Sequence, residues 1–173
     1  MNAMKLTCSM PSPLGTILLV ANMPGEALAG VYLERQKYFP DDAAAWNDSP
    51  RVPVFRKAVA QLREYFAGTR TVFDLPLAPE GTPFQRDVWT AIAAVPFGAT
   101  ITYGELARRC GRPSAVRAAG AATGRNPLTI VIPCHRIVGS GGAMTGYAGG
   151  LERKRALLAL EAPRANDLLL ELA

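Results

Sequence analysis

The sequence predicts an α+β fold, with a small N-terminal α/β domain that holds a short antiparallel sheet and a mostly helical C-terminal domain. Three observations support this fold class. Short apolar runs separated by proline and glycine turns fill the beginning of the chain. An amphipathic helical pattern follows them. Beyond residue 80, two helix-capping signatures and a glycine-containing turn indicate a cluster of short helices.

The N-terminal domain is expected to span residues 1–80. Three short strands are predicted from apolar runs bounded by turns, at residues 5–10, 15–22 and 26–34. A helix is predicted over residues 54–69, where Gly68 provides a stop. Its apolar residues recur at helical spacing: Phe55, Val59, Leu62 and Phe66. Residues 73–84 are rich in proline and glycine, so they form the expected linker.

The C-terminal domain, residues 81–173, begins with a strong helix signal. Thr82 and Gln85 have the spacing of a capping box, and Pro83 occupies the first helical position. The helix that follows is expected to bury one apolar face: Phe84, Val88, Trp89, Ile92 and Val95.

Two shorter helices are predicted next. Residues 102–105 form a second capping box, which begins a helix over residues 103–110 that Gly111 ends. Ser114 is expected to cap a third helix over residues 115–124. Two short helices joined by a tight turn in a basic region predict a DNA-binding helix-turn-helix.

The third helix has few side chains that could recognise bases. Between Pro113 and Gly124 it has five alanines, two glycines and one long polar side chain, Arg117. Major-groove recognition needs several long donors and acceptors. A helix of small residues can instead approach DNA closely, insert Arg117 and place Ser114 against phosphate, which favours minor-groove binding with little sequence preference. The alternative is a buried alanine-rich helix that serves only packing.

The net charge of +5 is concentrated in one segment. Between residues 86 and 136 only Asp87 and Glu105 oppose seven arginines, which suit bidentate contacts to phosphate. A solvated basic face is the alternative. The seven are Arg86, Arg108, Arg109, Arg112, Arg117, Arg125 and Arg136.

The rest of the composition indicates a cytoplasmic protein. The apolar stretch at residues 16–21 is too short for a signal peptide, and no apolar run reaches the roughly 18 residues of a membrane span. Cys8, Cys110 and Cys134 lack paired spacing, which fits a reducing compartment. A Cys₃His zinc site is arithmetically possible, but it lacks a close ligand pair such as C-x₂₋₄-C.

The only histidine, His135, directly follows Cys134 in the segment TIVIPCHRIV, residues 129–138. The apolar run predicts a buried strand that Pro133 interrupts just before the cysteine. Adjacent strand residues point to opposite faces, so the two side chains should not touch. A cysteine in a strand is most often structural and inert, whereas a neighbouring histidine and an upstream helix-turn-helix favour a reactive thiol.

These residues carry a family resemblance. The segment IPCHRIVGSGG, followed by TGYAGGLERKRALLALE, resembles the O6-alkylguanine-DNA alkyltransferases, also called methylated-DNA–protein-cysteine methyltransferases. The likeness extends back through RNP, AVRAAG, TYGELA and FQRDVWTAIAAVPFG, so it covers about residues 82–162. The first 80 residues match only in outline.

The resemblance implies a role for each matching residue. Cys134 corresponds to the alkyl acceptor, and His135 to the histidine that deprotonates it through a bridging water. Glu161 corresponds to the carboxylate that orients the histidine, and Asn126 to the asparagine that braces the preceding turn. Tyr103 corresponds to the tyrosine that donates a proton toward the departing guanine and crowds the DNA backbone.

The resemblance also implies how DNA and base are held. Arg117 corresponds to the finger that fills the space left by the extruded nucleotide, and Tyr103, Ser114 and Arg125 are the further expected DNA contacts. The expected base pocket is lined by Thr123, Ile137, Met144, Tyr147 and Ala148. Ala148 stands where some members have serine, which removes a hydroxyl contact to O6. No cofactor or metal is expected, because the only histidine is already assigned to catalysis.

The implied function is direct-reversal repair by a monomeric protein. The alkyl group of O6-alkylguanine in duplex DNA passes irreversibly to the cysteine after base flipping, and O4-alkylthymine is a second candidate substrate. A thioether has no easy hydrolytic exit, so each protein molecule acts once. Two alternatives are a lesion sensor, whose known members replace the cysteine, and a cysteine hydrolase, which would leave the helix-turn-helix unexplained.

Overall fold

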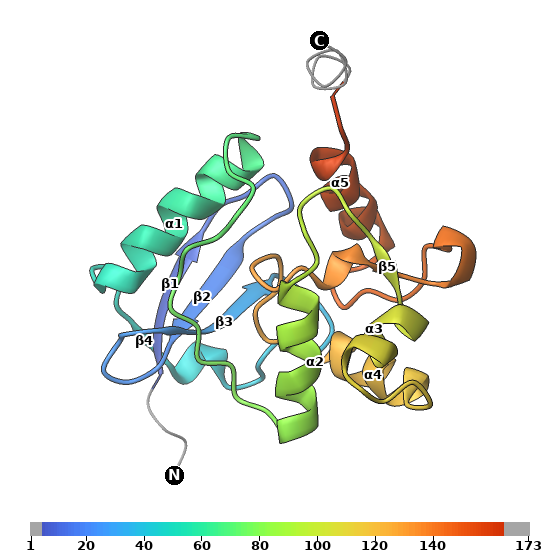
Figure 1. Cartoon of the computed structure of the whole chain (residues 1–173). Helices are drawn as coiled ribbons and strands as arrows, with labels where there is room; N and C mark the ends of the chain where they lie inside the picture. The colour runs from blue at the N-terminus through green and yellow to red at the C-terminus, as the bar shows by residue number, and fades with distance from the viewer. Residues whose placement is uncertain (1–4, 165–173) are drawn as a thin grey trace.

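The computed structural model describes residues 5–164. A small sheet with one helix against it stands beside a group of four helices (Figure 1). The sheet belongs to the N-terminal part of the chain, and the helices belong to the C-terminal part. The first residues of the expected N-terminal domain, 1–4, and the last residues of the expected C-terminal domain, 165–173, lie outside the described residues.

The sheet has four strands in the order β3-β2-β1-β4. Its first three strands are antiparallel and confirm the three predicted runs, and β4 pairs parallel to β1 after the short 3₁₀ turn η1 (Ala43–Ala45). The strand bounds are β1 (Leu6–Met10), β2 (Ile17–Ala21), β3 (Leu28–Leu33) and β4 (Asn47–Asp48).

Helix α1 (Pro53–Phe66) lies along the sheet, with Phe55, Ala58 and Leu62 fully buried (Figure 1). The predicted stop is confirmed: Gly68 has φ +77° and donates its N–H to the carbonyl of Tyr65 at 3.0 Å. Glycine adopts this left-handed conformation without a steric penalty. The chain therefore leaves α1 close to Tyr65, which has a role at the site described below.

Three helices begin the C-terminal part of the chain: α2 (Pro83–Ala93), α3 (Tyr103–Arg109) and α4 (Val116–Gly124). The capping box at Thr82 forms as predicted. At Thr102 only half of the predicted box forms, because the side chain of Glu105 accepts from Arg108 and Arg109 and does not reach back. The indole of Trp89 donates to the carbonyl of Ala122 at 2.8 Å and ties α2 to α4.

The predicted cap of the third helix is wrong. Ala115 occupies the N-cap of α4, and its methyl side chain cannot accept a hydrogen bond. Ser114 lies one residue earlier and is exposed in the turn. Helix α4 begins at Val116, one residue later than expected, and the N–H of Ala115 donates to the carbonyl of Arg112 where a serine cap was predicted.

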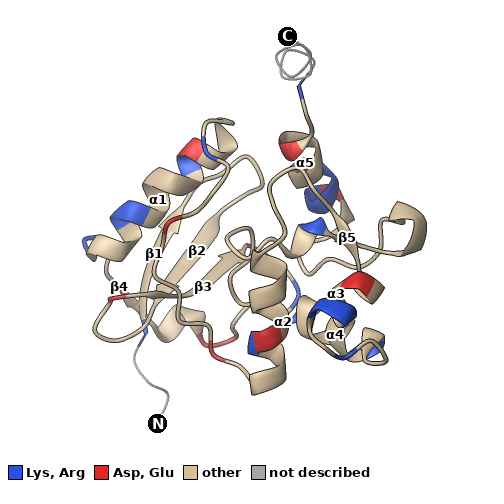
Figure 2. Ribbon diagram, viewed as in Figure 1, with Lys and Arg blue, Asp and Glu red and all other residues tan. Residues whose placement is uncertain are grey.

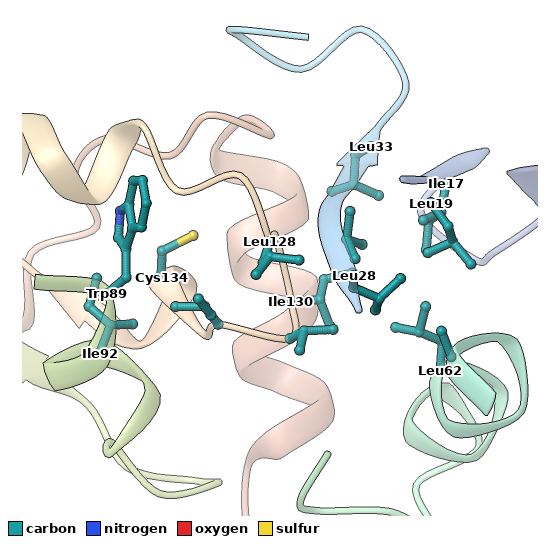
Figure 3. Packing of buried hydrophobic residues seen from close by; sticks show 14 of the residues in the cluster. Ile17, Leu19, Leu28, Leu33, Leu62, Trp89, Ile92, Leu128, Ile130 and Cys134 are labelled. Atoms are coloured by element: carbon teal, nitrogen blue, oxygen red, sulfur yellow. The ribbon is translucent and has the colours of Figure 1, made fainter. Parts of the chain in front are cut away.

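The predicted strand before Cys134 is also wrong. Residues 128–132 make isolated bridges and a turn in which Ile130 has φ +74°. Cys134–Arg136 form the 3₁₀ turn η2, and only Ile137–Val138 form a strand, β6, which pairs parallel to β5 (Ile101–Thr102). The segment is apolar because it runs through the core between the sheet and the helices (Figure 3).

One core joins the two parts of the chain. Leu128 and Ile130 lie between Leu28 on the sheet side and Cys134 on the helical side (Figure 3). Backbone hydrogen bonds reinforce this contact, because Val31 donates to Pro127 at 2.8 Å and accepts from Thr129 at 3.0 Å. The chain then passes through η3 (Ser140–Gly142) to α5 (Leu151–Glu161).

Within residues 5–164, no helix is long and apolar enough to cross a membrane. The same residues contain no group of three or more His, Cys, Asp or Glu side chains placed to hold a metal ion. The three cysteines Cys8, Cys110 and Cys134 are all free thiols.

Candidate active site

Cys134 lies at a cavity of about 360 Å³ between the two parts of the chain. The 3₁₀ turn η2 places it there with 5% of its surface exposed. Residues from α3, α4 and the loop before α5 form most of the lining, and one loop of the N-terminal part closes a side. The lining comprises Lys37, Tyr38, Tyr103, Gly120, Ala121, Thr123, Gly124, Cys134, Gly146, Tyr147 and Ala148.

Behind the cavity, Glu161 is the centre of a buried polar network. Its Oε1 lies 2.7 Å from His135 Nε2 and accepts from Arg136 Nη2 at 2.9 Å. Its Oε2 accepts from Arg136 Nε at 2.8 Å. Tyr65 Oη donates to Oε1 at 2.7 Å. The predicted pairing of His135 with Glu161 is thus present, whereas Arg136 and Tyr65 were not predicted to take part.

The network fixes the state of the histidine. Burial alone would raise the pKa of Glu161, but hydrogen bonds from His135, Arg136 and Tyr65 outweigh it and lower the pKa to about 2. An ionised carboxylate only accepts, so the proton of the imidazole resides on Nε2. Burial lowers the pKa of His135. The histidine is therefore neutral near pH 7, and its Nδ1 is available as a base.

His135 Nδ1 is buried and has no hydrogen-bond partner among the residues that the structure describes. A buried nitrogen of this kind normally has a partner. An acceptor nitrogen on the residue that follows Cys134 suits a proton that comes from the thiol, directly or through water.

Cys134 is a thiol at rest. Burial raises its pKa, whereas a hydrogen bond with Asn126 and the charge of Lys154 lower it. Since burial is the largest of these effects, the thiolate needs a base to form at neutral pH. His135 is the only side chain of the buried network that can take the proton.

Asn126 braces the turn that carries Cys134. Its Nδ2 donates to the carbonyl of Ile132 at 2.8 Å, and its Oδ1 accepts from the N–H of Leu128 at 2.9 Å. The turn between them contains Ile130 at φ +74°, which is unfavourable for a β-branched residue. The asparagine thus holds a strained turn closed directly before the reactive thiol.

Lys154 is fully buried and organises the pocket loop. Its Nζ donates to the carbonyls of Ile137, Thr145 and Gly146 at 2.6, 2.8 and 3.2 Å. This residue was not predicted from the sequence. The available signal was its position seven residues before Glu161, which places both on one face of a helix.

Two tyrosines of the lining stay protonated. Burial is the largest of the effects that raise the pKa of Tyr103 and of Tyr147, and the nearby Cys134 adds to it. Tyr147 Oη is buried without a partner among the described residues. Both hydroxyls can therefore donate to a bound ligand.

The structure places most of the predicted pocket residues together. Thr123, Tyr147 and Ala148 line the cavity, with Cys134 and Tyr103. Ile137 and Met144 do not line it. Ile137 is fully buried in β6 because its side chain belongs to the core, and Met144 is half-buried in the loop.

Arginines lie on α3, on α4 and on the turn that joins them (Figure 2). Arg117 is exposed on α4. Arg125, at the end of α4, stacks over the ring of Tyr38 at 3.7 Å, which is a contact between the two parts of the chain. Arg136 was wrongly predicted to belong to the basic segment that contacts phosphate, because it is buried and paired with Glu161.

The comparisons with known proteins cover both parts of the chain. A family model described as the DNA-binding domain of 6-O-methylguanine DNA methyltransferase matches residues 83–163. A second, described as the ribonuclease-like domain of the same protein, matches residues 7–79.

Individual relatives are similar over nearly their whole length. The methylated-DNA–protein-cysteine methyltransferase of Mycolicibacterium paratuberculosis is 46% identical over 153 residues, which are 88% of this chain and 90% of that protein. The protein of that name from Methanosarcina acetivorans is 45% identical over 87% of this chain and 94% of its own. The crystal structure of Mycobacterium tuberculosis OGT in complex with DNA has a TM-score of 0.82 at 41% identity. It covers 95% of this chain and 99% of that one. The predicted α+β fold class is thereby confirmed.

Proposed function

The chain belongs to the 6-O-methylguanine DNA methyltransferase family, and we propose that Cys134 is the residue that accepts the alkyl group. The protein is a methylated-DNA–protein-cysteine methyltransferase that repairs alkylated DNA by direct reversal. The observation that carries the residue assignment is the buried base: Nδ1 of a neutral His135 has no partner among the described residues, and the buried Cys134 precedes it in the same turn, η2.

The transfer is a nucleophilic displacement. The thiol proton of Cys134 moves to Nδ1 of His135, through a bridging water, and the thiolate attacks the alkyl carbon on O6 of guanine. The C–O6 bond breaks as the S–C bond forms, and its electron pair stays on the base. The hydroxyl of Tyr103 supplies a proton to the departing guanine, and the protonated histidine then returns the thiol proton, through solvent, to the phenolate of Tyr103. Because the product is a thioether, each protein molecule reacts once.

DNA binding is assigned to α4 and its flanks. The exposed Arg117 and the small residues of α4 support close approach in the minor groove, and the cavity opens directly beside Gly120, Ala121 and Gly124. The base must leave the duplex to reach Cys134, and Arg117 fills the space it vacates. Exposed Ser114 and Arg125 lie near phosphate in this arrangement.

The remaining assignments concern the setting of the reaction. The protein acts as a cytoplasmic monomer on O6-alkylguanine, with O4-alkylthymine as a second candidate substrate, and its two domains divide near residue 80. Free thiols at Cys8, Cys110 and Cys134 support a reducing compartment. Ala148 at the cavity supplies no hydroxyl, so the contact to O6 falls to its backbone N–H.

The test is an intact mass of the protein after incubation with duplex DNA that contains one O6-methylguanine. The expected result is a gain of one methyl per protein molecule, located on Cys134 by peptide mapping, and no gain in Cys134→Ser. Cys110→Ser is the matched control and should still gain the methyl. An unchanged mass with tight binding to the lesion would indicate a sensor and would refute the assignment. Turnover of an ester would indicate a hydrolase.

A further inference from the structure

One contact of the catalytic network comes from the N-terminal part of the chain. Tyr65, in the last turn of α1, donates its hydroxyl to Glu161 Oε1 at 2.7 Å across 96 positions of sequence. Tyr65 is 1% exposed and Glu161 is 2% exposed. The hydrogen bond is therefore shielded from water, where such bonds are strongest.

The contact reaches the same oxygen that binds the histidine. Oε1 of Glu161 accepts from Tyr65, from His135 Nε2 and from Arg136 Nη2. Donors that share one acceptor oxygen weaken each other, because each hydrogen bond withdraws electron density from that oxygen. Tyr65 is thus two hydrogen bonds away from the base of the reaction, with Glu161 between them.

The tyrosine ring is held in place by aromatic neighbours. Phe66 and Phe73 have ring centroids 5.4 Å from that of Tyr65, and Phe97 lies at 6.3 Å. Edge and tilted contacts of this kind favour one ring orientation. The hydroxyl consequently arrives at Glu161 in a fixed position.

We propose that Tyr65 is a positioning residue for alkyl transfer, whose hydroxyl orients Glu161 and sets the proton affinity of His135. This role rests on the proposed function of Cys134 and His135, and it makes the N-terminal part of the chain a contributor to the chemistry. The alternative is that the hydroxyl only satisfies a buried carboxylate and has no effect on the histidine.

The sign of the effect follows from the dipole of the hydroxyl. Its hydrogen points toward Oε1, so its positive end lies close to His135 and disfavours a second proton there. The other charged groups that act on the histidine are Glu161 and Lys154 of α5 and Arg136 of η2. Glu161 favours the protonated histidine, whereas Arg136 and Lys154 oppose it. Removing the hydroxyl should raise the pKa of His135.

The test uses the fact that His135 is the only histidine of the chain. Its imidazole signals can be followed by NMR titration without ambiguity. In Tyr65→Phe the midpoint is expected to move up by as much as about one pH unit, the size that an ordinary hydrogen bond allows. In the pH profile of the single-turnover methyl-transfer rate, the acid limb should move up by the same amount. At a fixed pH on that limb, below the wild-type midpoint, the rate then falls by up to about tenfold.

Two further variants separate positioning from packing. Phe73→Leu disturbs the same aromatic cluster without touching Glu161, so it should lower stability and leave the histidine midpoint unchanged. Site-specific 3-fluorotyrosine at position 65 is a stronger donor that keeps the ring, and it should move the midpoint down. This second substitution tests the idea even if Tyr65→Phe folds poorly.

The outcomes are distinct. A midpoint that stays constant in both Tyr65→Phe and the fluorotyrosine protein would overturn the proposal, as would an equal shift in Phe73→Leu. In a Glu161→Gln background, Tyr65→Phe should add no further shift, because the two residues act through one contact. The NMR titration does not depend on activity. If the wild-type protein gains no methyl group, the proposed function is refuted. A constant His135 midpoint in the titration would refute the role of Tyr65 alone.

Discussion

At the scale of single residues, the site depends on one buried carboxylate. Glu161 receives four hydrogen bonds from three side chains, which compensate for the loss of water around its charge. A buried network is stabilising only when every member is satisfied. Here the carboxylate is fully used, and the ring nitrogen of His135 that does not face it, Nδ1, has no partner among the described residues.

The low pKa of Glu161 predicts how stability depends on pH. The pKa is about 2 in the folded protein and 4.5 for an unperturbed glutamate, so the stabilising effect is complete above about pH 5. It is lost as pH falls toward 2, and the loss amounts to about 3 kcal/mol. In Glu161→Gln the free energy of unfolding, measured with urea, should therefore fall less between pH 6 and pH 3 than in the wild type.

The control for this measurement is Glu26→Gln, which removes an exposed carboxylate. It should retain the wild-type pH dependence of unfolding. A Glu161→Gln protein that loses as much stability as the wild type over this pH range would show that another group controls acid unfolding.

At the scale of elements, local signals predicted the helices well. The capping box at Thr82 and the stop at Gly68 depend only on neighbouring residues, so the sequence alone locates them. The segment before Cys134 was predicted as a strand because its apolar residues are continuous. Its real conformation depends on Asn126 and on the sheet residue Val31, which are tertiary contacts that periodicity cannot reveal.

The same distinction applies to the site. Cys134, His135 and Glu161 were identified through a motif resemblance, and the structure joins the last two by a hydrogen bond. Tyr65 and Lys37 reach the site only through the packing of the N-terminal part on the helices, so no local pattern marks them. The count of seven arginines between residues 86 and 136 overstated the basic surface, because the sequence does not distinguish the buried Arg136 from exposed arginines.

Helix α4 leads to a prediction about DNA. If Arg117 fills the space left by the flipped base, Arg117→Ala should slow methyl transfer from duplex DNA by about 10- to 100-fold, because a few kcal/mol of unstacking are no longer offset. Transfer from the same lesion in a single strand should change much less. Arg86→Ala, which removes an exposed arginine on α2, is the matched control and should affect both substrates slightly. Equal losses on duplex and single strand would exclude the finger role.

At the scale of the whole molecule, the two parts of the chain are held together by more than apolar contact. The backbone of Lys37 donates to Ala148 at 2.8 Å, next to the cavity. The guanidinium of Arg153, on α5, donates to the carbonyls of Leu14 and Glu34 at 3.0 and 2.9 Å. With the Tyr65–Glu161 contact, these bonds make the active site an interface between the two parts.

This shared core predicts that the protein unfolds in one step. Trp46 reports on the N-terminal part, and the buried Trp89 reports on the helical part. In Trp89→Phe and in Trp46→Phe, the fluorescence of the remaining tryptophan and the far-UV circular dichroism of the same variant should give coincident urea transitions, the signature of two-state unfolding. If either tryptophan had a midpoint separate from the circular dichroism, the two parts would unfold independently. Tyr65 could then leave Glu161 while the helices stay folded, so the catalytic network would be open to regulation by the N-terminal part. Coincident transitions instead mean that His135 retains its full set of partners whenever the cavity exists, because the contacts that form the cavity also hold Tyr65 against Glu161.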